Sequence, residues 1–131
     1  GPGLCEVIEG KLPVEKAVYP AGEGMSLIPA GESILDPGIL LDENLFKKIL
    51  GHFHKEYSLI IVNCANLREY KDAAMIATGV DGVVLAVSEG GVRRQVVGHA
   101  ILPLKEKQTN LIGAIMSNRN FVIPKILYER L

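Results

Sequence analysis

The chain lacks tryptophan, and its aromatic residues make up only 5% of 131 residues. The formal net charge is −1, so the composition offers neither the positive charge nor the stacking rings on which nucleic-acid binding depends. The two cysteines, Cys5 and Cys64, are too few for a disulfide framework, and we expect a reducing cytoplasmic setting. No apolar run approaches the roughly 20 residues that span a bilayer, and no signal peptide is visible. We therefore expect no nucleic-acid partner and no direct membrane insertion.

What is present is enough apolar sequence for a packed core. Hydrophobic residues make up 48% and the mean hydropathy is +0.24. This length suits a single compact domain over residues 1–131, without internal repeats. The chain opens with Gly1-Pro2-Gly3 rather than methionine, so we expect either a tag remnant or a fragment of a longer protein.

Apolar runs predict strands at 25–28, 59–62, 83–87 and 111–116. Between them, helical periodicity covers 40–57, a short helix fits 70–78, and a third covers 92–107, where Pro103 should break or kink it. Loops are predicted at glycine- and proline-rich positions, including Pro20-Ala21-Gly22. Strands that alternate with helices predict a three-layer α/β/α fold with a mostly parallel sheet, whose central strands are 59–62, 83–87 and 111–116.

One predicted strand ends at a position that is often functional. Open α/β sheets bind ligands at the carboxyl ends of their strands, and Asn63 follows the run Leu59–Val62. P-loop nucleotidases place an aspartate there to help hold Mg²⁺, whereas an asparagine carries no charge for a hard cation. The chain also contains no G-x-x-x-x-G-K-[ST] phosphate loop.

The order of short motifs resembles the cytoplasmic kinase domain of bacterial tyrosine autokinases (BY-kinases), which act with polysaccharide co-polymerases in capsule and exopolysaccharide export. More distantly it is similar to the MinD/ParA class of P-loop ATPases. Matching segments follow one another over nearly the whole chain: Gly3–Gly10 (family G-L-x-D-x-L-x-G), Leu27–Gly31 (L-P-A-G), Asp36–Phe46, Tyr57–Ala65, Asp72-Ala73, Asp81–Arg94 and Gly113–Arg119.

The same resemblance exposes departures. The match starts after the family's first strand, phosphate loop and its helix. Asn63 stands in place of the aspartate, Cys64-Ala65-Asn66 in place of Thr-Pro-Pro, and Ser58 in place of the acid before the strand. The terminal tyrosine cluster is also missing, since Tyr128 is the only tyrosine in the last third. The resemblance therefore implies a P-loop NTPase-like fold without the first strand and phosphate-loop helix, and a diverged relative.

Carried over from the family, the nucleotide-binding positions are Asn63, Asp72 and Asn118, near the metal, the terminal phosphate and the base respectively. Each residue also has an ordinary structural explanation. Asn63 could end a strand through local hydrogen bonds, Asp72 could interact with the dipole of its helix, and Asn118 could belong to a turn. Arg93 and Arg94 open a helix after two glycines, where they could contact an anion or an acidic partner, or form a solvated face. No catalytic constellation and no metal site is predicted.

Three functions stay open. The first is a non-catalytic BY-kinase-like domain of polysaccharide export that acts through protein–protein contact. The second is a fragment of an ATP-binding tyrosine autokinase whose phosphate loop lies upstream, and the third is a MinD/ParA-like ATPase regulator. We expect no cofactor for this chain, with ATP and Mg²⁺ only if an upstream phosphate loop exists. We also expect a homo-oligomer, a membrane polysaccharide co-polymerase as a further partner, and a cytoplasmic location at the inner face of the membrane through that partner.

Overall fold

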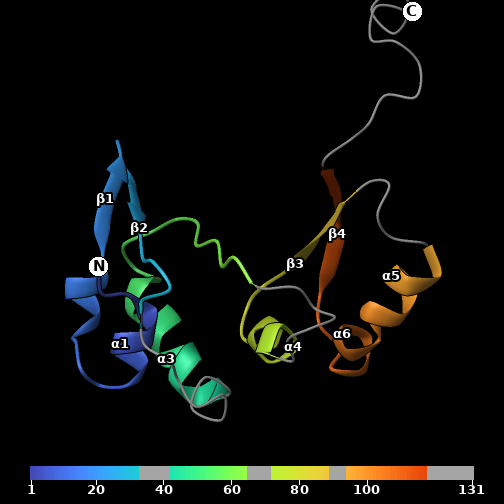
Figure 1. Cartoon of the computed structure of the whole chain (residues 1–131), viewed down its shortest axis with the longest axis horizontal. Helices are drawn as coiled ribbons and strands as arrows, with labels where there is room; N and C mark the ends of the chain where they lie inside the picture. Colours follow the sequence, from blue (N-terminus) through green and yellow to red (C-terminus); the bar gives the residue numbers. More distant parts are fainter. Residues whose placement is uncertain (33–41, 65–71, 89–93, 118–131) are drawn as a thin grey trace, which may run out of the picture. The chain divides into compact units, whose positions relative to one another are not determined.

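The computed structural model describes residues 1–32, 42–64, 72–88 and 94–117. The chain divides into two compact units, Gly1–Cys64 and Ala65–Leu131 (Figure 1). Each unit combines helices with a two-stranded sheet. The α/β class predicted from the sequence agrees with this content, and the single-domain organisation stays a prediction.

The first unit begins with a short helix, α1 (Leu4–Ile8), whose end is closed by a glycine. Gly10 has φ of +73°, which an L-residue with a side chain rarely adopts. Its N–H donates to the carbonyl of Val7, and the N–H of Lys11 donates to that of Glu6. This pair of bonds is a Schellman motif, which satisfies carbonyls that the helix leaves open.

A 3₁₀ turn, η1 (Val14–Ala17), leads into an antiparallel hairpin of β1 (Tyr19–Gly22) and β2 (Met25–Leu27). The predicted strand at 25–28 is therefore present but pairs antiparallel, and the predicted loop at Pro20–Gly22 was wrong. Gly22 and Gly24 have φ of +139° and +69°, which lets the chain reverse within two residues after β1. Pro20 is tolerated because a two-stranded ribbon has open edges where no N–H is needed.

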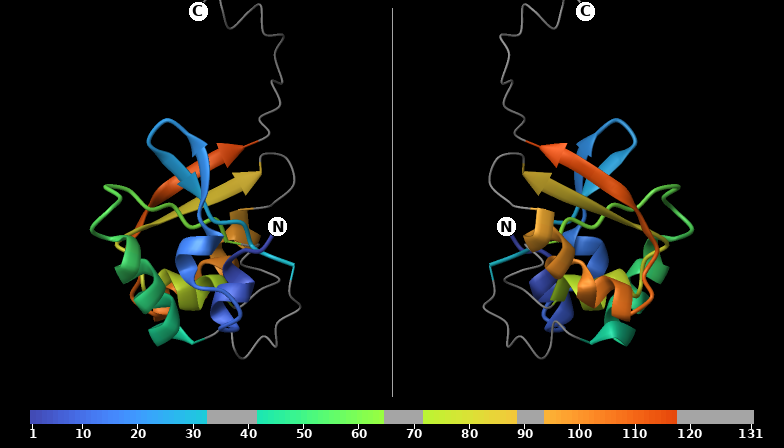
Figure 2. Two further views of the ribbon diagram at one scale, coloured as in Figure 1. Left: turned by 90° about the vertical axis from the view of Figure 1, so that its left-hand side faces the viewer. Right: turned by 90° about the vertical axis from the view of Figure 1, so that its right-hand side faces the viewer.

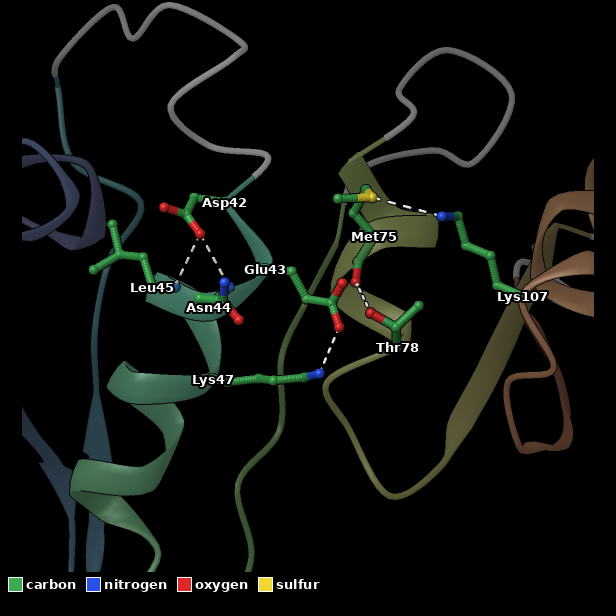
Figure 3. A network of polar contacts seen from close by, with 8 residues as sticks. All are labelled: Asp42, Glu43, Asn44, Leu45, Lys47, Met75, Thr78 and Lys107. Carbon is green, nitrogen blue, oxygen red and sulfur yellow. Dashed lines mark hydrogen bonds and ion pairs between the residues drawn. The ribbon is translucent and has the colours of Figure 1, made fainter.

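The helix predicted over 40–57 is present as α3 (Glu43–Phe53). It begins where Asp42 accepts hydrogen bonds from the backbone N–H groups of Asn44 and Leu45, at 3.0 and 3.3 Å (Figure 3). An ion pair one turn apart, Glu43 to Lys47, follows on the exposed side. Ile49 and Phe53 are buried, as the periodicity predicts.

The predicted strand at Leu59–Val62 was wrong. Residues 58–64 have no regular secondary structure, and the side chains of Leu59 and Ile61 are 73% and 81% exposed. A strand exists only through hydrogen bonds to a neighbour, and within the described ranges no strand pairs with this run. β-propensity is a property of the run itself and does not supply the pairing partner.

In the second unit, β3 (Val83–Ser88) and β4 (Leu111–Ser117) pair parallel, as predicted (Figure 2). The register runs from Val83 opposite Leu111 to Ser88 opposite Ser117, with a shift after the first pair. The shift sets Val84 against Gly113 and leaves one extra residue on β4, which is the geometry of a bulge.

Three helices accompany these strands: α4 (Asp72–Ala77), α5 (Arg94–Ala100) and α6 (Leu102–Glu106). The predicted break at Pro103 is confirmed, because α5 ends at Ala100 and Pro103 lies in the first turn of α6, where its missing N–H costs nothing. Ala74 and Ala77 of α4 pack with Leu104 of α6 and with partly buried Val83. This small cluster is the core of the second unit.

Candidate functional site

Asn63, at the centre of the predicted nucleotide site, lies in the first unit after the run Leu59–Val62 and is exposed to solvent. Cys64 beside it is exposed too, and no disulfide joins it to Cys5. An exposed, neutral amide can donate and accept hydrogen bonds with water or a ligand, but it supplies no charge to a metal.

The other predicted positions belong to the second unit or lie outside the described residues. Asp72 and Arg94 are the first residues of α4 and α5. Arg93 and Asn118 fall outside the described ranges. The grouping of these residues into one site stays a prediction.

The carboxyl edge of the parallel pair is where a ligand site of this fold class is expected. β3 and β4 end side by side, with Ser88 opposite Ser117. Asn118 directly follows Ser117 in sequence, and Arg93 and Arg94 follow Ser88 by a few residues. The chain therefore leaves both strands at the same edge of one sheet before it reaches these residues.

The sequence analysis missed a contact between two of the family-like motifs. The N–H groups of Leu4 and Cys5 donate to the carbonyls of Pro29 and Ala30, both at 2.8 Å. The start of α1 is thereby held against the segment that follows β2. Helix starts leave N–H groups without intrahelical acceptors, and here a distant backbone supplies them.

Glu6 completes this contact through its carboxylate. One oxygen accepts from the N–H of Gly3 at 2.6 Å, and the other accepts from the N–H of Glu32 at 3.1 Å. A glutamate at the third helical position that reaches back to the residue before the helix is half of a capping box, so the Gly3–Glu6 spacing was the available signal. The bond to Glu32 had no local signal.

The described residues contain neither a cluster of metal ligands nor a membrane-spanning helix. No group of three or more His, Cys, Asp and Glu side chains that could hold a metal occurs in ranges 1–32, 42–64, 72–88 and 94–117. Over the same part of the chain, none of the helices has the length and apolarity needed to cross a membrane.

The two cysteines are expected to differ in reactivity. Burial raises the pKa of the Cys5 thiol above its ordinary value, and the nearby carboxylates of Glu6 and Glu9 add to the shift. A raised pKa leaves less of the nucleophilic thiolate at a given pH, so we expect iodoacetamide at pH 8 to alkylate exposed Cys64 about tenfold faster than Cys5. Peptide mapping by mass spectrometry measures both rates, and Cys64→Ser should retain only the slow reaction. Equal rates in the folded chain would contradict this expectation.

No protein-family profile matches the chain. Among curated proteins it is 26% identical over 96 residues to the tyrosine-protein kinase CpsD of Streptococcus agalactiae, covering 73% of this chain and 42% of that protein. It is 25% identical over 118 residues to the tyrosine-protein kinase YwqD of Bacillus subtilis, covering 89% of this chain and 50% of that protein. The chain thus spans half or less of the length of these relatives.

Solved structures give the same picture of the fold. The kinase domain of VpsO superposes with a TM-score of 0.81 at 23% identity, covering 91% of this chain and 59% of that one. The kinase domain of the Escherichia coli tyrosine kinase ETK superposes with a TM-score of 0.79 at 22% identity, covering 93% and 50%. The resemblance predicted from the motif order is confirmed.

Proposed function

We propose that this chain, a homologue of bacterial tyrosine kinases that shares the fold of their kinase domains, is a non-catalytic kinase-like domain that acts by binding other proteins. The observation that carries the proposal is Asn63, a neutral and exposed side chain where the family-type site uses an aspartate. Without that charge the attraction for Mg²⁺ falls, and with it the neutralisation of the phosphate oxygens during transfer.

The neighbouring residues support the same conclusion. Cys64, Ala65 and Asn66 replace the residues that follow the aspartate in the family pattern, and Ser58 replaces the acid that precedes the strand. Several changes around one site point in one direction, whereas the packed cluster of Ala74, Ala77, Val83 and Leu104 keeps the apolar character that folding needs.

The proposal extends to the setting in which such domains work. We place the domain in capsule or exopolysaccharide biosynthesis, at the cytoplasmic face of the membrane through a polysaccharide co-polymerase partner, and in a homo-oligomer. The complete fold would be the three-layer α/β/α arrangement with a mostly parallel sheet. The small net charge gives copies little electrostatic repulsion against association.

An ATP-binding tyrosine autokinase is the second candidate. Asp72 favours it, since the acid stands at the family position near the terminal phosphate and begins α4. In this case a phosphate loop elsewhere in the protein would hold ATP and Mg²⁺, and Asn63 would act through a bound water. A MinD/ParA-like regulator requires the same nucleotide binding and is tested by the same experiment.

We expect the intact gene product to show no magnesium-dependent ATP binding tighter than about 1 mM by calorimetry, which corresponds to only about 4 kcal/mol. It should also form no phosphotyrosine when incubated with ATP and Mg²⁺, as detected by immunoblot. The physical reason is the absence of a charged ligand for the metal at position 63.

Two variants sharpen this test. Asn63→Asp restores the charge, and Asn44→Asp is the matched control because it makes the same change in the first turn of α3, away from the site. Magnesium-dependent ATP binding that appears in Asn63→Asp alone would identify Asn63 as the cause of the loss. Micromolar binding by the unaltered protein, or phosphotyrosine that disappears in Asp72→Asn, would overturn the proposal in favour of the autokinase.

A further inference from the structure

A shallow hollow of about 440 Å³ lies in the first unit, open to solvent, between the β1–β2 hairpin and the residues that follow α3. Its walls include Pro20 and Met25 from the hairpin and Glu56 and Tyr57 after the helix. None of these positions belongs to the predicted nucleotide site. The hollow joins segments thirty or more residues apart in sequence, so only the tertiary structure creates it.

The aromatic wall of the hollow is held in place. The hydroxyl of Tyr57 donates to Oγ of Ser26 at 2.9 Å, which links it to β2. Its backbone N–H donates to the carbonyl of Phe53 at 3.1 Å, and the two rings meet edge to face with centroids 6.0 Å apart. The Tyr57 side chain is thus hydrogen-bonded to β2 through its hydroxyl and contacts the buried ring of Phe53.

The hollow carries a negative charge without a matching cation. Glu56 is the only acidic residue among those that line the hollow. Within the described part of the chain, the ion pairs join other residues, and none involves Glu56. The hollow therefore combines an acidic residue, an aromatic ring and apolar residues. These groups complement a planar cation that is attached to an apolar chain.

We propose that this hollow binds an arginine side chain of a partner protein. A guanidinium group can pair with the Glu56 carboxylate through two parallel N–H donors and lie against the ring of Tyr57. Its methylene stem would cover Pro20 and Met25. Arginine suits this combination better than lysine, whose compact ammonium has no flat face to stack.

A protein segment, rather than a free small cation, fits the surroundings of the hollow. Met25 and Leu27 of β2 are 58% and 57% exposed, and so present apolar surface at and beyond the hollow. A segment that places apolar residues beside its arginine would cover both, and arginine and tyrosine are common energetic centres of protein interfaces. An arginine-bearing segment would be one partner for the interaction domain proposed above. Only the assignment of the ligand to a protein rests on that proposed function.

The test is a titration of the full ¹⁵N-labelled chain followed by NMR, with N-acetyl-arginine amide and its neutral analogue N-acetyl-citrulline amide as probes. We expect the arginine probe to shift the amide signals of Gly22–Ser26 and Glu56–Tyr57, and the citrulline probe to bind at least about threefold more weakly. Shifts of equal size with both probes, or no shift in these segments at about 50 mM, a concentration that detects even very weak binding, would overturn the site.

Variants separate the parts of the hollow. Glu56→Gln should weaken the arginine probe about fivefold, and Glu106→Gln, an exposed glutamate of α6, should leave it unchanged. Tyr57→Leu should weaken it about threefold, whereas Tyr57→Phe keeps the ring and most of the binding. Unchanged binding in Glu56→Gln would overturn the proposal.

A peptide pair tests whether the occupant is a protein segment. N-acetyl-Leu-Arg-Val amide should bind more tightly than N-acetyl-Gly-Arg-Gly amide if Met25 and Leu27 take part. Equal binding would overturn the assignment to a protein segment. These titrations involve no nucleotide, so their failure differs from failure of the proposed function, which would appear as magnesium-dependent ATP binding or phosphotyrosine.

Discussion

Replacing Gly3 with alanine is expected to lower the free energy of unfolding of the first unit by about 1–3 kcal/mol, the usual cost of forcing extra atoms into a packed place. A Cβ at this position would lie 2.2 Å from the carbonyl oxygen of Pro29 and 2.5 Å from the N of Gly31. Both atoms are backbone, so neither can rotate away as a side chain would. The backbone of Gly3 is extended, with φ of −147°, so the cost comes from space rather than from dihedral strain.

The structure also indicates where this loss should appear. The N–H of Leu4 bonds the Pro29 carbonyl that a Cβ at Gly3 would push away, and the N–H of Cys5 bonds the next carbonyl along the chain, that of Ala30. Hydrogen exchange should therefore speed up first at these two amides, while those of the second unit remain protected. Protection of Leu4 and Cys5 that survives in Gly3→Ala would contradict the expectation.

Gly51→Ala is the matched control. Gly51 lies inside α3, and a Cβ there would meet no atom within 4 Å. Alanine is the better helix former, so this variant should raise stability by about 0.5–1 kcal/mol. The same substitution at two glycines of one unit is thus expected to have opposite signs.

Replacing Leu104 with alanine is expected to cost about 2–5 kcal/mol, the range for large-to-small changes in a packed core. Leu104 is 1% exposed and is the only large side chain within the described ranges that is almost completely buried. It holds α6 against Ala74 and Ala77 of α4. Two alanines offer little side chain that could move into the cavity, so the loss should lie well inside this range rather than at its lower end.

Urea unfolding followed by circular dichroism, combined with hydrogen exchange of β3 and β4, measures this effect. Leu102→Ala is the control, since Leu102 belongs to the same helix but is 45% exposed. It should cost less than about 1 kcal/mol, as surface substitutions usually do. Equal losses for the two variants would show that Leu104 does not form the core of the second unit.

Much of the local structure could be predicted because its causes are local. The start of α3 depends on Asp42, which bonds N–H groups only two and three residues away. The division between α5 and α6 depends on Pro103, whose ring and missing N–H act on the adjacent turn. The strands β3 and β4 are continuous apolar runs, and helices between such runs predict their parallel pairing.

The candidate site could be predicted only in part. The sequence placed Asp72 at a helix start, and it does begin α4. Asn63 was expected at the end of a buried strand, yet it follows an exposed run that no described strand pairs. The sequence showed where Asn63 lies in the order of motifs. Its exposure could not be predicted, because it depends on whether another strand pairs with the preceding run, and hydrophobic periodicity does not identify that strand.

The sequence by itself determined the family resemblance, the presence of a helix within 40–57, the helix break at Pro103 and the neutral residue at position 63. Only the tertiary structure decided that Pro20 lies in a hairpin, that Glu6 accepts from the N–H of Glu32, and that Glu56 and Tyr57 border a hollow beside Met25. Caps, helix breaks and amphipathic patterns act within a few residues, so they can be recognised in a linear sequence. Strand pairing and contacts across 26 or more residues depend on which distant segments meet, because the free energy that stabilises them is gained only after the chain between them has been ordered.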